Sequence, residues 1–319
     1  MIDKPRPSIA FIGECMVEIR KDVNGRINQA FAGDTLNTAV YLARLLPGSQ
    51  QLIHYITALG VDPVSVSMIR YFVEEGIECE KIRRFSDKKP GSYQIEVDAN
   101  GERSFQYLRN QSAARYLLSG DGYDKELASL VDIDYLYLSG ISLAILPRHD
   151  RQKLIDGLVR AKERGSQIWF DSNYRHKLWA SNDEAQQWYR KIIRITDIAF
   201  LTFDDECQLW GDSSPEDVFA RCRFYGIPEV VLKRGEESCL IETNDKKYAV
   251  KAISIPSEKV IDTTAAGDSF NAGYLASRLQ GELLPAECAA MGHCLSSKVI
   301  QYHGAIIPRK LVYGMTESG

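Results

Sequence analysis

The chain has 319 residues, of which 45% are hydrophobic, and a formal net charge of −4. This length and apolar content allow a large buried core and are typical of a globular protein with one or two domains. The negative charge disfavours nucleic acid or an anionic membrane as the main partner. No stretch approaches the roughly 20 apolar residues that cross a bilayer. We therefore expect small-molecule ligands, with no nucleic-acid or membrane partner.

The cysteines and the N-terminus indicate the compartment. The seven cysteines are scattered, odd in number and without a Cys-x-x-Cys pair, as is typical of reduced thiols. The five histidines lack metal-ligand spacing with them, so we expect no zinc. Residues 1–8 carry charges and two prolines, unlike a signal peptide. We expect a cytoplasmic protein.

Short apolar strands alternate with longer amphipathic helices along the chain. Strands are predicted at 9–13, 52–59, 135–139, 168–171, 198–201 and 230–233, and helices at 34–46, 64–75, 147–164, 268–279, between 171 and 198, and from 215. This alternation predicts an α/β fold, with a mainly parallel sheet between helices. No repeat or linker interrupts it, so we expect a single domain over residues 1–319.

Two segments break this alternation. Residues 18–31 and 93–107 are predicted as exposed hairpin strands, the second around an Asn100-Gly101 turn. Such strands need a surface to lie on. We expect a small projecting β-sheet that acts as a lid, inserted at approximately 15–32 and 88–110; ordinary edge strands of the main sheet are the alternative.

The segment from Asp262 to Phe270 carries the strongest chemical signal. Small residues at Ala265, Ala266 and Gly267 lead into an amphipathic helix, so several backbone N–H groups point at one spot. That is an anion site, and Asp268 lies at its mouth. A carboxylate there suits a general base for phosphoryl transfer to a hydroxyl. The alternative is a plain helix start with an acidic first turn.

This segment resembles the C-terminal signature of the ribokinase-like (PfkB-type) carbohydrate kinases, Asp-Thr-x-Gly-Ala-Gly-Asp-x-Phe, with Ala265 where glycine is usual. Further segments resemble that family in the expected order, namely 32–37, 60–62, 171–175 and 233–235. The matches run from residue 9 to about residue 308. The resemblance implies a three-layer α/β/α sandwich that uses ATP and Mg²⁺, with a monovalent cation such as K⁺ near Asp262 left open.

The resemblance also implies roles for individual residues. The amides of Ala265, Ala266 and Gly267 would stabilise the transferring phosphoryl group, while Asp268, at an ordinary pKa near ~4, takes the acceptor proton late in the transfer. The remaining implied positions are Gly33, Asp34 and Asn37 against the acceptor, Lys233, Gly235, Ser238 and Ser297 beside the nucleotide, and Glu206 at Mg²⁺ through water. Phe203 replaces the asparagine of the metal motif, for which Asp204 or Asp205 would compensate.

The lid and the Asp171 strand indicate the acceptor. Arg109 and Arg175 suggest a carboxylate in the substrate. Tyr93 and Tyr107 share one hairpin face by parity and could bind its oxygens. This set resembles the 2-keto-3-deoxygluconate kinases, as do Gly13-Glu14 and Gln301–Pro308, and implies phosphorylation of the C6 hydroxyl of that sugar acid.

Two other functions remain open. The chain could be a kinase of a neutral sugar such as fructose or ribose, with structural arginines. It could also be a catalytically weak, nucleotide-binding regulatory protein, as the departures at Thr35, Phe203, Ser238 and Ala265 suggest. Glu18 stands where ribokinases often have a sugar-binding acid, and a surface strand residue is the alternative. The exposed lid strands predict a homo-oligomer that pairs through the lid sheet.

Overall fold

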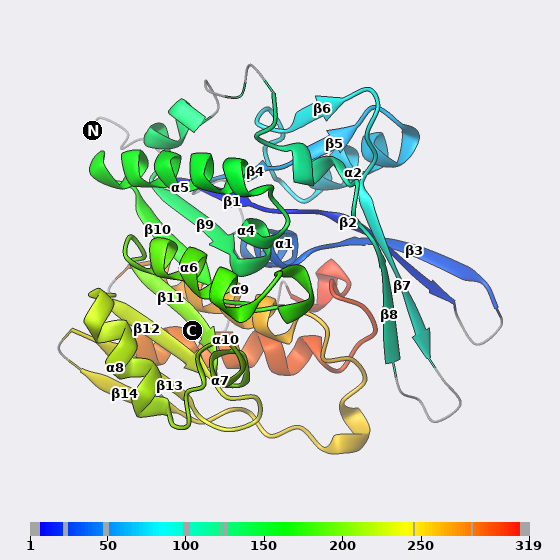
Figure 1. Cartoon of the computed structure of the whole chain (residues 1–319). Coiled ribbons are helices and arrows are strands. Elements are labelled where there is room, and N and C mark those ends of the chain that lie inside the picture. Colours follow the sequence, from blue (N-terminus) through cyan, green and yellow to red (C-terminus); the bar gives the residue numbers. More distant parts are fainter. Residues whose placement is uncertain are drawn as a thin grey trace, which may run out of the picture.

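The computed structural model describes residues 7–21, 25–46, 51–97, 103–120, 123, 127–244, 246–281 and 283–312. Its body is an eight-stranded sheet in the order β14-β13-β12-β11-β10-β9-β1-β4 (Figure 1). The strands are β1 (Ser8–Ile12), β4 (Leu52–Ile56), β9 (Tyr135–Ser139), β10 (Gln167–Asp171), β11 (Ile198–Thr202), β12 (Glu229–Lys233), β13 (Cys239–Thr243) and β14 (Lys247–Val250). Pairing is parallel from β4 to β12, and β13 and β14 add antiparallel.

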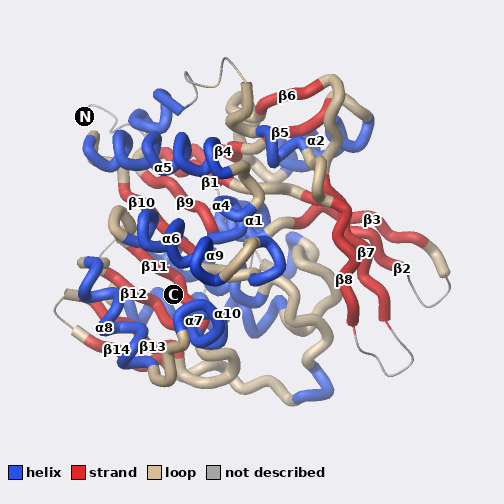
Figure 2. The backbone as a smooth tube through the Cα atoms, in the orientation of Figure 1, coloured by secondary structure: helices blue, strands red, loops and turns tan. Residues whose placement is uncertain are grey.

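Helices cover both faces of this sheet (Figure 2). One layer holds α1 (Asp34–Leu45), α2 (Pro63–Glu74), α9 (Ala266–Leu279) and α10 (Pro285–Val299). The other holds α4 (Gly140–Ala144), α5 (Arg148–Glu163), α6 (Asn182–Ile193), α7 (Phe203–Trp210) and α8 (Pro215–Tyr225). The predicted three-layer α/β/α sandwich is thereby confirmed.

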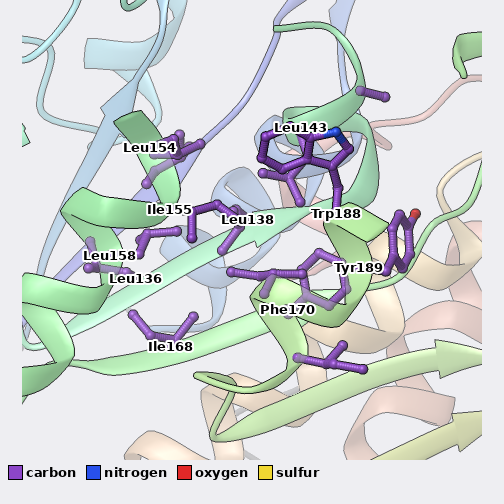
Figure 3. Close-up of a cluster of buried hydrophobic side chains, with 14 of the residues drawn as sticks. Leu136, Leu138, Leu143, Leu154, Ile155, Leu158, Ile168, Phe170, Trp188 and Tyr189 are labelled. Atoms are coloured by element: carbon purple, nitrogen blue, oxygen red, sulfur yellow. The ribbon is translucent and has the colours of Figure 1, made fainter. Parts of the chain in front are cut away.

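The strands are apolar along their whole length because both faces are covered. In β10, Ile168 and Phe170 belong to the core under α5 and α6, whereas Trp169 belongs to the core under α1 and α9. Figure 3 shows the first of these cores, where Leu154 and Leu158 of α5 lie over the strand residues. The two cores fix the carboxyl ends of the parallel strands, where the candidate site is built.

A second, four-stranded sheet projects from the body (Figure 1). It consists of β2 (Met16–Lys21), β3 (Ile27–Ala32), β7 (Gly91–Val97) and β8 (Arg103–Leu108), in the order β3-β2-β7-β8. We call it the lid. The predicted separate sheet is confirmed, and edge strands of the main sheet are excluded for these four. The predicted Asn100-Gly101 turn lies outside the described residues.

The inner end of the lid packs on the body. Met16, Ala32, Tyr93 and Ile95 bury their side chains with Ala305, and this cluster is flanked by Ala265 and Ile306. The lid therefore rests directly on the loop that opens α9.

Most predicted bounds of the main sheet and its helices lie within one residue of the observed ones, and two differ by more. The strand expected over 52–59 breaks at Thr57, whose carbonyl accepts from Arg83 N at 2.9 Å, and the chain continues as β5 (Ala58–Gly60) paired with β6 (Arg83–Phe85). The helix expected from Asp268 begins at Ala266, because Ser269 N already donates to Ala265 O at 2.9 Å in the helical i to i−4 pattern. Among the described helices, none combines the length and apolarity needed to span a bilayer.

Candidate active site

The starts of α1 and α9 meet beside the carboxyl ends of the parallel strands. Asn37 donates from Nδ2 to Asp268 Oδ2 at 2.8 Å, and its Oδ1 accepts from Gly33 N at 3.3 Å. Gly33 must be glycine, since a Cβ there would lie 2.1 Å from the carbonyl oxygen of Glu14. Three residues predicted from distant segments, Gly33, Asn37 and Asp268, thus lie together.

The segment 262–267, which we call the anion loop, reaches α9 through a left-handed residue. Ala265 has φ 60°, a conformation that costs a non-glycine residue roughly 1–2 kcal/mol. Ala266 N donates to Thr263 O at 3.1 Å, so this amide is engaged within the turn. The first N–H groups of α9 have no intrahelical acceptor, and they face the mouth of the helix together with its positive dipole end.

Asp262 anchors the anion loop. Its side chain is buried, and it accepts from Thr264 N at 3.1 Å and from Gly304 N at 2.9 Å. Arg20, on the lid strand β2, lies 3.2 Å from the same carboxylate. The loop is therefore held from within, from the C-terminal segment and from the lid.

The ionisation of Asp268 differs from the sequence-based expectation. Burial, and next the charge of Asp34, raise the pKa of Asp268 to about 7, while the hydrogen bond from Asn37 opposes the shift. The expected ordinary pKa near ~4 is thus corrected: clustered acids and low solvent access make its ionised form costly. A base with a pKa near the working pH suits proton abstraction from a hydroxyl.

Asp34 is the second acid of the cluster. It accepts from Asn173 Nδ2 at 2.9 Å, and burial is the main cause that raises its pKa. Asn173 itself has a φ of 31°, in the region that favours glycine. An asparagine held in that conformation, with its amide on Asp34, indicates a constrained acceptor pocket.

Lys233 lies beneath the anion loop. Its Nζ is 3.1 Å from Asn271 Oδ1 and 3.4 Å from Asp171 Oδ1, and a Cβ on Gly267 would lie 3.4 Å from it. Gly235 continues this turn with φ 59°. These positions bring a cation to the loop where phosphate is expected.

The other two predicted nucleotide contacts lie further out. Ser238 offers its carbonyl to Arg234 Nε at 3.0 Å, in the turn between β12 and β13. Ser297, on α10, donates to Cys294 O at 2.9 Å and is half-buried. On the preceding turn, His293 is buried against Phe270 and contacts Val250 O at 3.2 Å, as expected for a structural histidine.

The three acids of α7 differ in burial and in hydrogen-bond or ion-pair partners. Glu206 is buried and paired with Arg221 at 2.6 Å, and burial raises the pKa of Glu206 to about 7. Asp205 accepts from Tyr174 N at 3.2 Å, and burial is the main cause that raises its pKa. Asp204 is exposed. Among the described residues, no three His, Cys, Asp or Glu side chains form a ready metal cluster.

Mg²⁺ nevertheless fits this donor set. In phosphoryl-transfer sites Mg²⁺ usually takes one or two carboxylates, water and the substrate phosphates, so no protein cage is required. Asp205 and Asp171 are close enough for Asp171 to raise the pKa of Asp205, and Lys233 lowers it. The charges of Asp171 and Lys233 therefore act on the Asp205 carboxylate, which itself lies 3.7 Å from Arg175 Nη1.

The lid tyrosines lie as parity predicts. Tyr93 and Tyr107 are directly opposite in the β7–β8 register, with ring centroids 5.7 Å apart. Tyr93 is buried and donates to Glu18 Oε2 at 2.6 Å, whereas Tyr107 is exposed. The alternative of Glu18 as a surface residue is wrong, because its carboxylate is turned inward and is only 4% exposed.

Arg109 lies buried between the lid and the body. It is paired with the buried Glu14, and its guanidinium lies 5.8 Å from the centroid of the Tyr107 ring. Within the described structure, Glu14 Oε1 and Arg109 Nε have no hydrogen-bond partner. The pair thus leaves one buried acceptor and one buried donor unsatisfied within the described structure.

Arg175 takes a different position. Its side chain is 53% exposed, donates to Tyr174 O at 2.9 Å and lies 3.7 Å from Asp205 Oδ2. Among the described residues, Arg109 and Arg175 share no ion-pair partner. Each of the two arginines predicted to bind the substrate carboxylate is thus paired with a different acid of the protein, Arg109 with Glu14 and Arg175 with Asp205.

Comparison with known proteins identifies the family. The model of the pfkB family carbohydrate kinases matches residues 6–311. The chain belongs to this family. It is 48% identical to the 2-dehydro-3-deoxygluconokinase of Escherichia coli strain K12, over 95% of this chain and 97% of that protein. It is 43% identical to the 2-dehydro-3-deoxygluconokinase of Haemophilus influenzae, over 94% and 96% of the two chains.

Solved structures support the fold. The crystal structure of a 2-dehydro-3-deoxygluconokinase from Thermotoga maritima superposes with a TM-score of 0.84 at 19% identity, over 98% of this chain and 100% of that one. A putative ribokinase II from E. coli in complex with ATP and Mg²⁺ superposes with a TM-score of 0.79 at 18% identity, over 98% and 99% of the chains. The ribokinase-like fold is thereby confirmed.

The structure also brings to this region Asn271, Arg20 and the partner of Arg109, which the sequence prediction did not single out as site residues. Asn271 follows Asp268 by three positions, so helical spacing alone would have placed both on one face of α9. Arg20 follows Glu18 by two, so strand parity would have placed both on one face of β2. The Glu14–Arg109 pair joins residues 95 positions apart and has no local signal.

Proposed function

We propose that the chain is a 2-dehydro-3-deoxygluconokinase. It would transfer phosphate from ATP to the C6 hydroxyl of 2-keto-3-deoxygluconate and release 2-keto-3-deoxy-6-phosphogluconate and ADP. Near-full-length relatives at 43% and 48% identity support this acceptor. The observation that carries the chemistry is Asp268 at the anion loop, with Asn37 fixing its carboxylate at 2.8 Å.

Asp268 acts as the base in this proposal. Its pKa of about 7 lets it receive the acceptor proton as the hydroxyl oxygen bonds to phosphorus. The N–H groups of Ala265, Gly267 and Asp268 take up the charge of the phosphoryl oxygens, whereas that of Ala266, also expected here, is engaged with Thr263 O. Because the transition state is loose, this alignment matters more than base strength.

The acceptor would bind between α1 and the lid. Gly33, Asp34 and Asn37 line the body side, and Tyr93, Tyr107 and Arg109 line the lid side. The unpartnered Arg109 Nε supports recognition of a carboxylate, since a charge-assisted hydrogen bond to a buried guanidinium is strong and directional. Arg175 would approach the acceptor from the Asp205 side.

ATP would lie along the β12–β13 turn and α10. Lys233, Gly235, Ser238 and Ser297 are the proposed contacts, with Lys233 the best placed for phosphate. Mg²⁺ bound with ATP supplies charge neutralisation between the phosphates. Asp205 would hold it directly, and Glu206 would support it through water. A monovalent cation such as K⁺ beside Asp262 would add to the charge that Arg20 already brings there.

We also propose a cytoplasmic homo-oligomer. All seven cysteines are free thiols, in keeping with a reducing compartment. Ile27, Tyr107 and Leu108 of the lid are 67%, 52% and 78% exposed, and pairing with another lid would cover them. Light scattering of the wild type, compared with Leu108→Asp, tests this assembly.

An assay that couples ADP formation to a spectroscopic readout tests the function, with a panel of keto-deoxy acids and neutral sugars. Turnover with 2-keto-3-deoxygluconate and little with fructose or ribose is the expected result. The Glu14–Arg109 pair gives one reason to include neutral sugars, since Glu14 already neutralises that arginine. Selective turnover of a neutral sugar would reject the proposed acceptor, and no turnover at all would favour a regulatory nucleotide-binding protein.

A further inference from the structure

Arg20 connects the lid to the anion loop. Its Nη2 lies 3.2 Å from Glu18 Oε1 on its own strand and 3.2 Å from Asp262 Oδ2 at the start of the loop. The arginine side chain is 19% exposed and that of Asp262 only 1%, so the contact is shielded from solvent. Residues 242 positions apart are thereby joined.

The connection continues to the acceptor side. Glu18 accepts from Tyr93 through Oε2 at 2.6 Å and from Arg20 through Oε1. A chain of hydrogen bonds and ion pairs therefore runs from a lid tyrosine to the loop that faces the phosphate. Both carboxylate oxygens of Glu18 are thus engaged, one by Tyr93 and the other by Arg20.

The anion loop needs such external support. Ala265 holds a left-handed conformation that its side chain disfavours, and such residues persist only where their surroundings fix them. Asp262 is fixed in part by Arg20, and Ala265 packs against the lid cluster around Tyr93 and Ala305. The lid thus contacts both ends of the strained turn.

We propose that Arg20 is a positioning residue, which makes the phosphate-binding geometry of the anion loop depend on the docked lid. This inference rests on the proposed phosphoryl transfer. It assigns a role to Arg20, which does not itself contact the reacting groups. It also gives Ala265 a role. An alanine at this position, unlike a glycine, keeps the turn only while the lid supports it.

Kinetics of Arg20→Ala test the proposal. We expect kcat to fall by roughly 10- to 100-fold, since small misplacements far from the chemistry can cost about that much, with KM for the acceptor little changed. Millimolar guanidinium should restore part of kcat, and Arg20→Lys should retain more than Arg20→Ala. Arg278→Ala is the matched control, because it removes an arginine–carboxylate contact of 3.3 Å at the far end of α9.

Hydrogen exchange supplies a readout that needs no acceptor. Amides of the peptide spanning 262–270 should exchange faster in Arg20→Ala than in the wild type. In Arg278→Ala their exchange rates should equal those of the wild type. The three proteins should have the same global unfolding temperature. In the double variant Arg20→Ala/Ala265→Gly, part of kcat should return, because glycine adopts the left-handed turn without support.

Two outcomes would overturn the inference. One is wild-type exchange in the 262–270 peptide of Arg20→Ala. The other is a loss of kcat that neither guanidinium nor Ala265→Gly relieves. These results are distinct from a failure of the proposed function, which would appear as absent turnover in the wild type while the exchange difference persists.

Discussion

The regions around Asp268 and Glu206 contain the same chemical group in different settings. Burial raises the pKa of both acids to about 7. At Asp268 a second acid, Asp34, adds to the shift, and the neighbour that fixes the carboxylate is a neutral amide. At Glu206 the neighbour is the guanidinium of Arg221. A raised pKa alone does not identify a base; the neighbour decides whether the carboxylate can accept a proton from a substrate.

The largest effect is expected when Asp268, the proposed proton acceptor, is replaced. Asp268→Asn should lower kcat by about 10²- to 10⁴-fold, the usual contribution of a general base, because the amide cannot take the proton. ATP binding, measured by calorimetry, should remain. Activity near that of the wild type would reject Asp268 as the base.

A second, smaller effect is expected at Arg109. Arg109→Ala should reduce kcat/KM for 2-keto-3-deoxygluconate by roughly 10- to 100-fold, the equivalent of about 1.5–3 kcal/mol for a hydrogen bond to a charged group. Because the change leaves Glu14 buried without its partner, Glu14→Gln/Arg109→Ala serves as the folded control. Arg175→Ala should cost less, since its guanidinium is half-exposed. Equal losses with neutral sugars would contradict carboxylate recognition.

The pH profile should separate the two acids further. As pH falls through about 7, Asp268 gains a proton and kcat/KM should decline. Asp34→Asn removes a charge that raises this pKa, so the acid limb should move to lower pH. Glu206→Gln should leave the limb in place, because the charge of Glu206 is balanced by Arg221 at 2.6 Å. If the acid limb moved in Glu206→Gln and stayed in place in Asp34→Asn, the assignment of this limb to Asp268 would be rejected.

The same shift has a stability consequence of defined sign. The folded state raises the pKa of Asp268, so it binds a proton more tightly than the unfolded chain does. The contribution of this group to stability is therefore present at low pH and is lost as pH rises toward about 7. Asp268→Asn should accordingly gain unfolding temperature relative to the wild type as pH rises through that window.

The smallest effect concerns Mg²⁺. Asp205→Asn should raise the Mg²⁺ concentration for half-maximal activity more than Glu206→Gln does, since Asp205 lies 3.7 Å from the exposed Arg175 whereas Glu206 is paired with Arg221 at 2.6 Å. Titration of Mg²⁺ at fixed ATP measures both. A larger increase in Glu206→Gln than in Asp205→Asn would indicate that Glu206 is the main Mg²⁺ residue.

Most of the fold could be predicted from the sequence, because buried strands and amphipathic helices leave local signals. Tyr135–Ser139 was predicted at its observed bounds, and the lid followed from the two hairpins that interrupt the alternation. The break at Thr57 could not be predicted, since it depends on pairing with the distant Arg83. The site followed the same rule: Asp268 has a local motif, whereas the pairing of Glu14 with Arg109 depends on the folded chain.

The contacts of residues 305–307 with α1 have a consequence for the order in which the chain folds. Tyr41 OH donates to Ala305 O at 2.8 Å and accepts from Ile307 N at 3.0 Å, and Arg44 donates to Ile307 O at 2.6 Å. The packing of the helix that carries Asn37 is therefore completed by residues 263 to 266 positions later in the chain. A ribosome-bound chain cannot complete these contacts until residues 305–307 have been synthesised, so α1 acquires its final packing long after its own synthesis.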